Sequence, residues 1–198
     1  MLATANAVDA MMRVIAGEAR GSHLKTPKGV STRPTSDLVR GAIFNTLGSL
    51  AVDRSRVLDL YAGSGALGIE ALSRGAGWAD FVEHDERCCV IIKENLDHTG
   101  LAGRAHVYCL KVPKALSILS SRYGLVLLDP PYEDLSLLPT LERLTSSALV
   151  GPGSTLVIEH SRRTPLPENL GDFAPVKEIR HGDTCVSVYQ SKSRRLES

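Results

Sequence analysis

The sequence predicts one α/β domain: a mostly parallel, seven-stranded sheet with helices on both faces and a small N-terminal β-hairpin extension. Two observations support this prediction. Beyond Arg56, short apolar runs alternate with helical segments, which is typical of parallel strands joined by crossover helices. Near the end of the chain, two further runs flank Gly182 and Asp183, a pair that favours a tight hairpin turn.

The expected strands are short apolar runs. Five parallel strands are expected at residues 57–61, 79–83, 105–109, 125–129 and 155–159, and a terminal antiparallel pair at 176–180 and 185–189. Ligands of such sheets bind beyond the carboxyl ends of the parallel strands. The residues that follow those strands are therefore the first candidates for a functional site.

The front section precedes the main sheet. A β-hairpin is expected between residues 13–16 and 22–25, because these runs flank two glycines. A helix follows with Thr35 or Ser36 as its N-cap, and apolar residues then recur at helical spacing, at Val39, Ile43, Leu47 and Leu50. The chain thus divides into a disordered N-terminus (1–11), a hairpin extension (12–34), the main domain (35–190) and a basic tail (191–198).

Charge and composition narrow the class of protein. The net charge is only +1, but residues 1–40 hold six basic and three acidic residues, and residues 191–198 hold three and one. Basic ends on a neutral body suit binding to phosphate, although solvated tails would give the same pattern. The four cysteines lack metal-binding or disulfide spacing, so buried reduced thiols are expected. With neither a signal segment nor a membrane span, the chain is expected in the cytoplasm.

The first chemical motif lies between the first strand and its helix. Gly63, Gly65 and Gly68 fit the pattern G-x-G-x-x-G, and Glu83 ends the next strand. A nucleoside cofactor suits this motif, because glycine lets the backbone approach the ligand and a carboxylate accepts hydrogen bonds from ribose. Asp59 favours S-adenosylmethionine (AdoMet) over a dinucleotide, since its carboxylate would attract the methionine ammonium group and repel a pyrophosphate. Asp59 could instead cap the loop.

The second motif follows the fourth strand, at Asp129, Pro130, Pro131 and Tyr132. Two prolines fix the backbone and leave the Asp129 carboxylate and the Pro130 carbonyl as acceptors. A planar exocyclic amine offers two N–H donors and is a poor nucleophile. The two acceptors would position the amine and stabilise the positive charge that develops on nitrogen, while Tyr132 stacks on the base. The motif predicts amino methylation that needs no metal.

These motifs resemble those of a known family. The segments LDLYAGSGALGIEALSRGA and LLDPPY, with MRVIAGEARG and STRPTSDLVRGAIFNTL before them, closely resemble the RsmD-type 16S rRNA guanine-N2 methyltransferases of bacteria. The resemblance spans Met12 to about Tyr189. It implies a Rossmann-like class I methyltransferase fold, AdoMet as cofactor, and transfer of a methyl group to the N2 amine of guanine 966 in 16S rRNA.

The resemblance also assigns residues to roles. It implies that Asp129 to Tyr132 form the catalytic tetrad, that Glu83 holds the ribose and that His84 lies beside the adenine. The remaining cofactor contacts would come from the loop residues Asp59, Tyr61, Ala62, Gly63, Ser64 and Gly65. One departure matters: the family usually has an Asp-Ala pair near the adenine, whereas this chain has Cys109-Leu110-Lys111. The contact from that acid to the adenine amino group is then either missing or replaced by a backbone group, with weaker AdoMet binding or a reshaped adenine pocket as the consequence.

The expected partner is 16S rRNA within an assembled or assembling small ribosomal subunit, bound by a monomer, with no membrane contact. A base buried in a helix cannot reach Asp129, so an exposed or flipped guanine is required. Candidate RNA contacts are Arg13, Arg20 and Lys25, called here the N-terminal basic set, together with Arg33 and Arg40. Arg33 and Arg40 could instead order the loop over the cofactor, and a helix-capping role suits them equally well. His160 could line the base pocket, although hairpin packing suits it better.

Other functions remain open at this point. DNA adenine-N6 or cytosine-N4 methylation would use the same Asp129 to Tyr132 motif, but those enzymes normally need a larger target-recognition region. A NAD-dependent oxidoreductase would use the glycines and give Asp129 no role. A non-catalytic RNA-binding module is disfavoured because both motifs are intact. NAD binding or methylated DNA would distinguish these alternatives.

Overall fold

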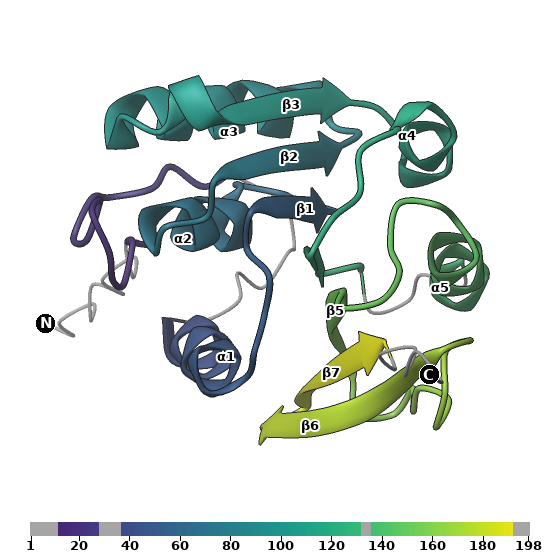
Figure 1. The fold of residues 1–198 in the computed structure, drawn as a ribbon. Helices are drawn as coiled ribbons and strands as arrows, with labels where there is room; N and C mark the ends of the chain where they lie inside the picture. The colour runs from purple at the N-terminus through teal and green to yellow at the C-terminus, as the bar shows by residue number, and fades with distance from the viewer. Residues whose placement is uncertain (1–11, 28–36, 132–135, 192–198) are drawn as a thin grey trace, which may run out of the picture.

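The apolar runs from Arg56 onward form one seven-stranded sheet of order β3-β2-β1-β4-β5-β7-β6 (Figure 1). The computed structural model describes residues 12–27, 37–131 and 136–191. The first five strands are parallel, and β7 pairs antiparallel with both β5 and β6. The strands are β1 (Arg56–Leu60), β2 (Trp78–Glu83), β3 (Ala105–Cys109), β4 (Leu125–Leu128), β5 (Thr155–Ser161), β6 (Phe173–His181) and β7 (Thr184–Ser191). The predicted fold class is confirmed.

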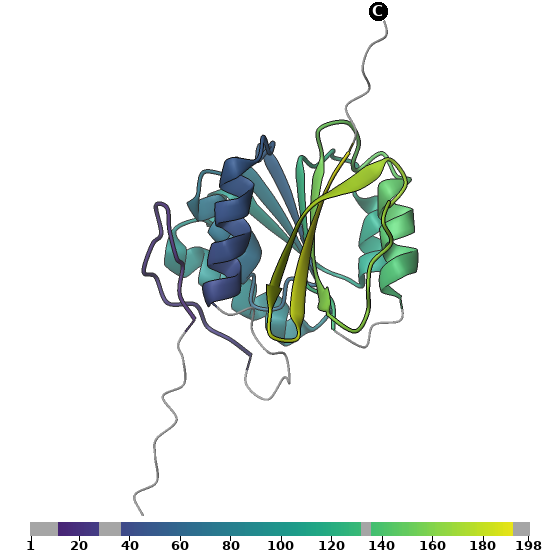
Figure 2. The same ribbon diagram turned by 90° about the horizontal axis from the view of Figure 1, so that it is seen from below.

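Helices cover both faces of this sheet, and Figure 2 shows the sheet between α1 and α5. The helices α1 (Asp37–Ser49), α2 (Ala66–Ser73) and α3 (Glu86–Thr99) bury their apolar faces in one core cluster. The helices α4 (Val112–Ile118) and α5 (Leu137–Thr145) belong to the other, and the short 3-10 helix η1 (Ala102–Arg104) precedes β3. Consecutive residues of β4 alternate between the two clusters, which explains why its sequence is continuously apolar.

The helical spacing predicted after Ser36 is confirmed in α1. Val39, Ile43 and Leu47 are buried against the sheet, and Leu50 is partly buried just beyond the helix. The expected N-cap residues lie outside the described residues. None of the helices in the described part of the chain has the length and apolar character needed to cross a bilayer.

The N-terminal segment differs from the expected β-hairpin. Its antiparallel pairing is limited to one bridge between Arg13 and His23, with three backbone hydrogen bonds between residues 12–14 and 21–24. The pairing ends there because the next backbone N–H groups donate to a side chain of α2. Ile15 N lies 2.8 Å from Glu70 Oε2, and Ala16 N lies 3.1 Å from Glu70 Oε1. The segment is therefore a docked loop rather than a regular ribbon.

The last hairpin is longer than predicted. Strand β6 begins at Phe173 and includes Pro175, with a register shift between Pro175 and Lys177. Proline lacks the N–H needed for a central strand, but β6 lies at the edge of the sheet, where that loss is tolerated. The turn between β6 and β7 is formed by Gly182 and Asp183, as the sequence predicts.

Candidate active site

Three carboxylates gather at the carboxyl edge of the sheet. Asp59 lies on β1, Glu83 ends β2, and Asp129 directly follows β4. These three strands are parallel neighbours, so their carboxyl ends lie at one edge of the sheet. The strand order reverses between β1 and β4, which is the point where ligands of such sheets bind. The backbone continues the pairing beyond the strands, since Asp129 N donates to Leu60 O at 3.4 Å. The two motifs that the sequence predicted to act together are therefore adjacent.

The loop between β1 and α2 has an unusual backbone. Gly63 and Gly65 have φ values of 56° and 78°, in the left-handed region that glycine adopts easily. Tyr61 has a φ of 60°, and it is the one non-glycine residue with positive φ in the described part of the chain. Such strained positions cluster at ligand-binding sites. The backbone of this loop is therefore shaped for close approach by a ligand, as the glycine pattern predicts.

Gly68 serves packing rather than backbone freedom. A Cβ atom at this position would lie 2.3 Å from Phe81 Cε1 and 2.9 Å from Asp59 Oδ2. Because β2 and α2 approach each other here, only a glycine fits. The third glycine of the pattern thus fixes the distance between the helix and the sheet.

Asp59 is only 1% exposed, and its Oδ2 accepts a hydrogen bond from Gly68 N at 2.8 Å. Burial raises the pKa of Asp59 well above its usual value; the Gly68 hydrogen bond opposes this rise, and Asp129 and Glu83 add to it. Both interpretations of Asp59 therefore have support. Its carboxylate caps the start of α2, and it also contributes to an acidic cluster that a bound cation would stabilise.

Glu83 is the centre of the loop's hydrogen bonds. Its Oε2 accepts from Gly63 N at 2.9 Å, and its Oε1 accepts from His84 N at 2.7 Å and from Asp85 N at 2.8 Å. These contacts hold the carboxylate directly beside the glycine loop. The structure thus brings together Gly63 and Glu83, the two halves of the predicted nucleoside motif. The His84 side chain is 66% exposed, and its Nδ1 lies 2.9 Å from Glu83 Oε1.

The Asp-Pro-Pro segment lies next to this loop. Asp129 is half-buried, Pro130 is buried and Pro131 is exposed. Asp59 pairs in register with Leu127, and Asp129 N donates to Leu60 O, so the two aspartates lie on neighbouring strands close to each other. Tyr132, the fourth member of the predicted tetrad, lies outside the described residues.

The end of β3 forms the other side of the loop region. Cys109 pairs in register with Glu83, and Leu110 N donates to Glu83 O at 2.8 Å. The Leu110 amide is therefore committed to the sheet and is not the backbone group that would replace the family's acid. Lys111 caps α4 through its carbonyl, which accepts hydrogen bonds from Lys114 N and Ala115 N at 3.0 Å.

The thiols fit the expected packing role. Cys88, Cys89 and Cys185 are buried, whereas Cys109 is exposed, and all four are free. Burial raises the pKa of Cys88 to about 11, and burial together with a hydrogen bond to Cys109 raises the pKa of Cys89 to about 12. These two thiols therefore stay protonated at neutral pH, which makes them poor nucleophiles.

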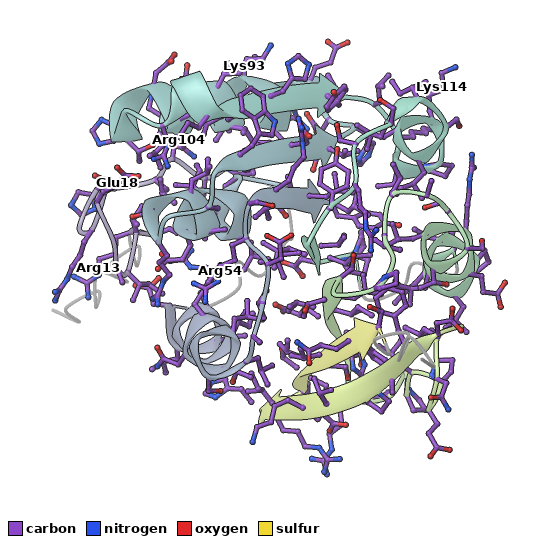
Figure 3. All side chains as sticks on the ribbon, in the orientation of Figure 1. Arg13, Glu18, Arg54, Lys93, Arg104 and Lys114 are labelled. Carbon is purple, nitrogen blue, oxygen red and sulfur yellow. The ribbon has the colours of Figure 1, made fainter. Side chains whose placement is uncertain are left out.

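The N-terminal basic set lies on the docked loop of residues 12–27. Arg13 is 65% exposed and pairs with Asp37 at 3.5 Å, and Lys25 is 68% exposed and pairs with Glu94 at 2.9 Å. Arg20 is exposed as well. Figure 3 shows Arg13 and Glu18 on this loop, with Arg104, the ion-pair partner of Glu18, close by. All three cations remain accessible to phosphate.

Arg40 was predicted to contact RNA, and this prediction is wrong. The Arg40 side chain is fully buried, and its Nη2 donates to Arg13 O at 2.6 Å and to Asp37 Oδ1 at 2.7 Å. Burial lowers its pKa, while Asp37 and Glu70 oppose that shift. Arg40 therefore holds the N-terminal segment against α1, a role that the sequence did not predict. Arg33 lies outside the described residues.

His160 is a packing residue, as preferred from the sequence. It is 5% exposed, and its Nε2 lies 2.9 Å from Ser187 Oγ. Its Nδ1 lies 3.1 Å from Ser161 O and 3.0 Å from Thr164 O, so Nδ1 carries the proton and Nε2 accepts from the serine. Both ring nitrogens are thus used within the protein. His160 also lines a hollow of about 540 Å³ over β5, β7 and β6, away from the glycine loop.

Sequence reasoning missed three polar side chains that join the N-terminal segment to the main domain. Glu70 and Ser73 on α2 and Asn95 on α3 are buried, and each bonds to the backbone of residues 15–25. Glu70 carried a signal that could have been used, since it interrupts the otherwise apolar run ALGIEALS. A buried acid in such a run needs a partner, and backbone N–H groups supply it.

The sheet order, the antiparallel β7 and the glycine loop after β1 together define a Rossmann-like methyltransferase fold. The particular family follows from comparison with known sequences. Residues 12–190 match the family described as conserved hypothetical protein 95. The chain therefore belongs to this family, the RsmD family, and the predicted resemblance is confirmed.

Named relatives cover nearly the whole chain. YlbH of Bacillus subtilis (strain 168), provisionally described as an rRNA methyltransferase, is 39% identical over 184 residues, covering 91% of this chain and 100% of the relative. Ribosomal RNA small subunit methyltransferase D of Escherichia coli (strain K12) is 32% identical over 183 residues, covering 92% of this chain and 91% of the relative. The solved structure of the Escherichia coli protein yhhF, a provisionally assigned methyltransferase, has a TM-score of 0.82 at 30% identity, covering 93% of this chain and 99% of that one.

Proposed function

We propose that the chain transfers a methyl group from AdoMet to the exocyclic N2 amine of a guanine in 16S rRNA. One observation carries the proposal: the Asp-Pro-Pro segment after β4 lies at the same edge of the sheet as the glycine loop after β1. A cofactor in the loop and an amine held by Asp129 would therefore be neighbours. The rRNA named in the descriptions of the relatives supports the substrate class.

The residues around the glycine loop suit AdoMet. Glu83 Oε1 is engaged by His84 and Asp85, but Oε2 accepts only from Gly63 N among the contacts described, so its second lone pair could accept from a ribose hydroxyl. The pKa of Asp59 is raised by burial and by two further carboxylates, so this region favours a positively charged ligand. AdoMet carries a sulfonium and an ammonium group. A pyrophosphate would meet repulsion from the same carboxylates.

Asp129 and Pro130 would act on the amine. The carboxylate of Asp129 and the carbonyl of Pro130 each accept one N–H bond, which orients the nitrogen lone pair toward the methyl group and stabilises its developing positive charge. AdoMet supplies an activated methyl group on sulfur. The N–C bond would form as the S–C bond breaks, and Asp129 would accept the proton that the nitrogen then loses.

The substrate would reach this edge as an exposed or flipped guanine of the small ribosomal subunit. The N-terminal basic set would bind phosphate along the approach, because its three side chains are exposed on one docked loop. We propose that the enzyme acts as a monomer in the cytoplasm, where assembling subunits are found. Arg40 is excluded from the RNA-binding surface by its burial.

The test is transfer of a labelled methyl group from AdoMet to small subunits that lack the modification, followed by nucleoside analysis. N2-methylguanosine is the expected product. Asp129→Asn keeps the size of the side chain but removes its charge, and we expect its kcat to fall by at least about 100-fold. Asp97→Asn changes an exposed acid on α3 and is the matched control, with no change expected. Unlabelled subunits, with N6-methyladenine or N4-methylcytosine formed in DNA, would contradict the rRNA assignment.

A further inference from the structure

The glycine loop is held from two sides. From the sheet, Glu83 accepts a hydrogen bond from Gly63 N. From α3, Asn95 Nδ2 donates to Ser64 O at 2.9 Å. Ser64 lies between two glycines with positive φ, and a backbone of this kind has few side chains of its own to fix its shape. The contact from Asn95 therefore restrains the part of the loop with the greatest conformational freedom.

Asn95 has further partners on the N-terminal segment. Its Oδ1 accepts from Lys25 N at 2.8 Å, and its Nδ2 also donates to Lys25 O at 3.0 Å. The side chain is fully buried, so both N–H groups and the carbonyl oxygen are used within the protein. One amide thus joins the glycine loop to the segment that carries the N-terminal basic set. Met12 makes a second link, since Ser64 Oγ lies 3.5 Å from Met12 Sδ.

The rest of the N-terminal segment is docked independently of Asn95. Ser73 Oγ accepts from Ala19 N at 3.0 Å and donates to Ala16 O at 2.6 Å, while Glu70 accepts from the amides of residues 15 and 16. A Cβ atom at Gly17 would lie 1.8 Å from Ser73 O, so this docking is close. The segment would therefore stay on α2 without Asn95. The distinct contribution of Asn95 is its bond to the loop.

We propose that Asn95 is a positioning residue for the cofactor: it holds the Ser64 carbonyl, and so the glycine loop, in the conformation that binds AdoMet. This inference rests on the proposed use of AdoMet. Loss of the bond frees a strained loop to adopt other conformations, and binding must then restore the competent one. Asn95 itself contacts neither reacting group, so the methyl-transfer step on the bound complex stays nearly unchanged.

The experiment compares Asn95→Ala and Asn95→Asp with Glu94→Ala. Glu94 is the adjacent residue on α3, and its exposed ion pair with Lys25 Nζ can be removed without changing the loop contact. Equilibrium dialysis with labelled AdoMet gives Kd, and steady-state assays give KM and kcat. All measurements are made well below the melting temperature of each variant.

For Asn95→Ala, we expect the Kd and KM for AdoMet to rise on the order of tenfold, with kcat at saturating AdoMet within about twofold of the wild type. Asn95→Asp loses both donors and places a carboxylate against two carbonyl oxygens, so its Kd should rise at least as much. Glu94→Ala should bind AdoMet as the wild type does. A purely structural Asn95 would lower the melting temperature and leave the Kd of the folded protein unchanged.

Two outcomes would overturn the proposal. In the first, both Asn95 variants fold and bind AdoMet with the wild-type Kd. In the second, neither variant folds, which would make Asn95 a folding residue rather than a positioning one. Failure of the wild-type protein to bind AdoMet would instead contradict the proposed function, so the two failures are distinguishable.

Discussion

Replacing Asp59 by asparagine should make the protein more stable and a poorer binder of AdoMet. Asp59 is 1% exposed, and burial raises its pKa well above the usual value, so the ionised form is costly in the folded state. An asparagine in the same place keeps an acceptor for Gly68 N, whose bond to Asp59 measures 2.8 Å. The substitution thus removes the buried charge without leaving the start of α2 uncapped.

The direction of the effect follows from the linkage between ionisation and folding. Each unit by which the folded-state pKa exceeds the unfolded one costs about 1.4 kcal/mol of stability once the group is ionised in both states. A buried polar group whose bonding is incomplete typically costs about 1–3 kcal/mol, and more when charged, so Asp59→Asn should raise the unfolding free energy at pH 7 by at least about 1 kcal/mol. Each kcal/mol corresponds to about 2–4 °C in Tm. Loss of the proposed pair between the Asp59 carboxylate and the AdoMet ammonium group would weaken AdoMet binding by about 2–4 kcal/mol, or about 30- to 1,000-fold in Kd.

The pH dependence gives the sharpest test. Because the folded-state pKa of Asp59 is raised, its contribution to stability is fully present below its unfolded pKa and is lost as the pH rises through the folded one. The advantage of Asp59→Asn should therefore be absent near pH 4 and should grow as the pH increases. Denaturant unfolding of both proteins across this range measures it, with Asp97→Asn as the exposed control. The reasoning would be refuted if Asp59→Asn were less stable than the wild type at pH 7, or if its gain in unfolding free energy were as large at pH 4 as at pH 7.

Two further predictions concern packing and RNA binding. Gly68→Ala should destabilise the protein by about 1–3 kcal/mol in denaturant unfolding, because its Cβ would overlap the Phe81 ring. Gly48→Ala, on α1, has open space around it and should be neutral or stabilising; equal losses at both glycines would contradict this account. Removing the charges of the N-terminal basic set should lower RNA affinity and reduce the slope of log K against log salt by up to about three. Arg40→Met should lower Tm but leave the salt slope unchanged in filter binding, because Arg40 is buried. A reduced slope would show that Arg40 does contact RNA.

The sheet could be predicted because its strands have an unambiguous sequence signature. Strand β4 is buried on both faces, so Leu125 to Leu128 form a continuous apolar run. Gly182 and Asp183 likewise predicted the position of the turn in the last hairpin. The N-terminal ribbon could not be predicted correctly, because its pairing competes with acceptors from α2 that lie 55 residues away in the chain. Local pattern alone does not reveal such a long-range hydrogen bond.

The site divides in the same way. Residues whose role depends on the missing side chain of glycine could be identified from spacing: Gly63 has a positive φ, and Gly68 leaves room for Phe81. Residues whose role depends on burial could not. The positive charge of Arg40 suggested phosphate, yet its guanidinium lies inside the protein. Asn95 had no distinguishing pattern at all, since its partners come from the loop and from the N-terminal segment.

Asp59, Glu83 and Asp129 together explain why the site should favour the methyl donor over its product. Burial raises the pKa of Asp59 most, and the neighbouring carboxylates Asp129 and Glu83 add to the rise, so bringing these groups together opposes folding. A sulfonium ion beside them would relieve the repulsion, whereas the neutral thioether left after methyl transfer would relieve less of it. The same acidic cluster would then both attract AdoMet and promote release of S-adenosylhomocysteine. A more stable arrangement, with a neutral side chain at position 59, would lose that difference.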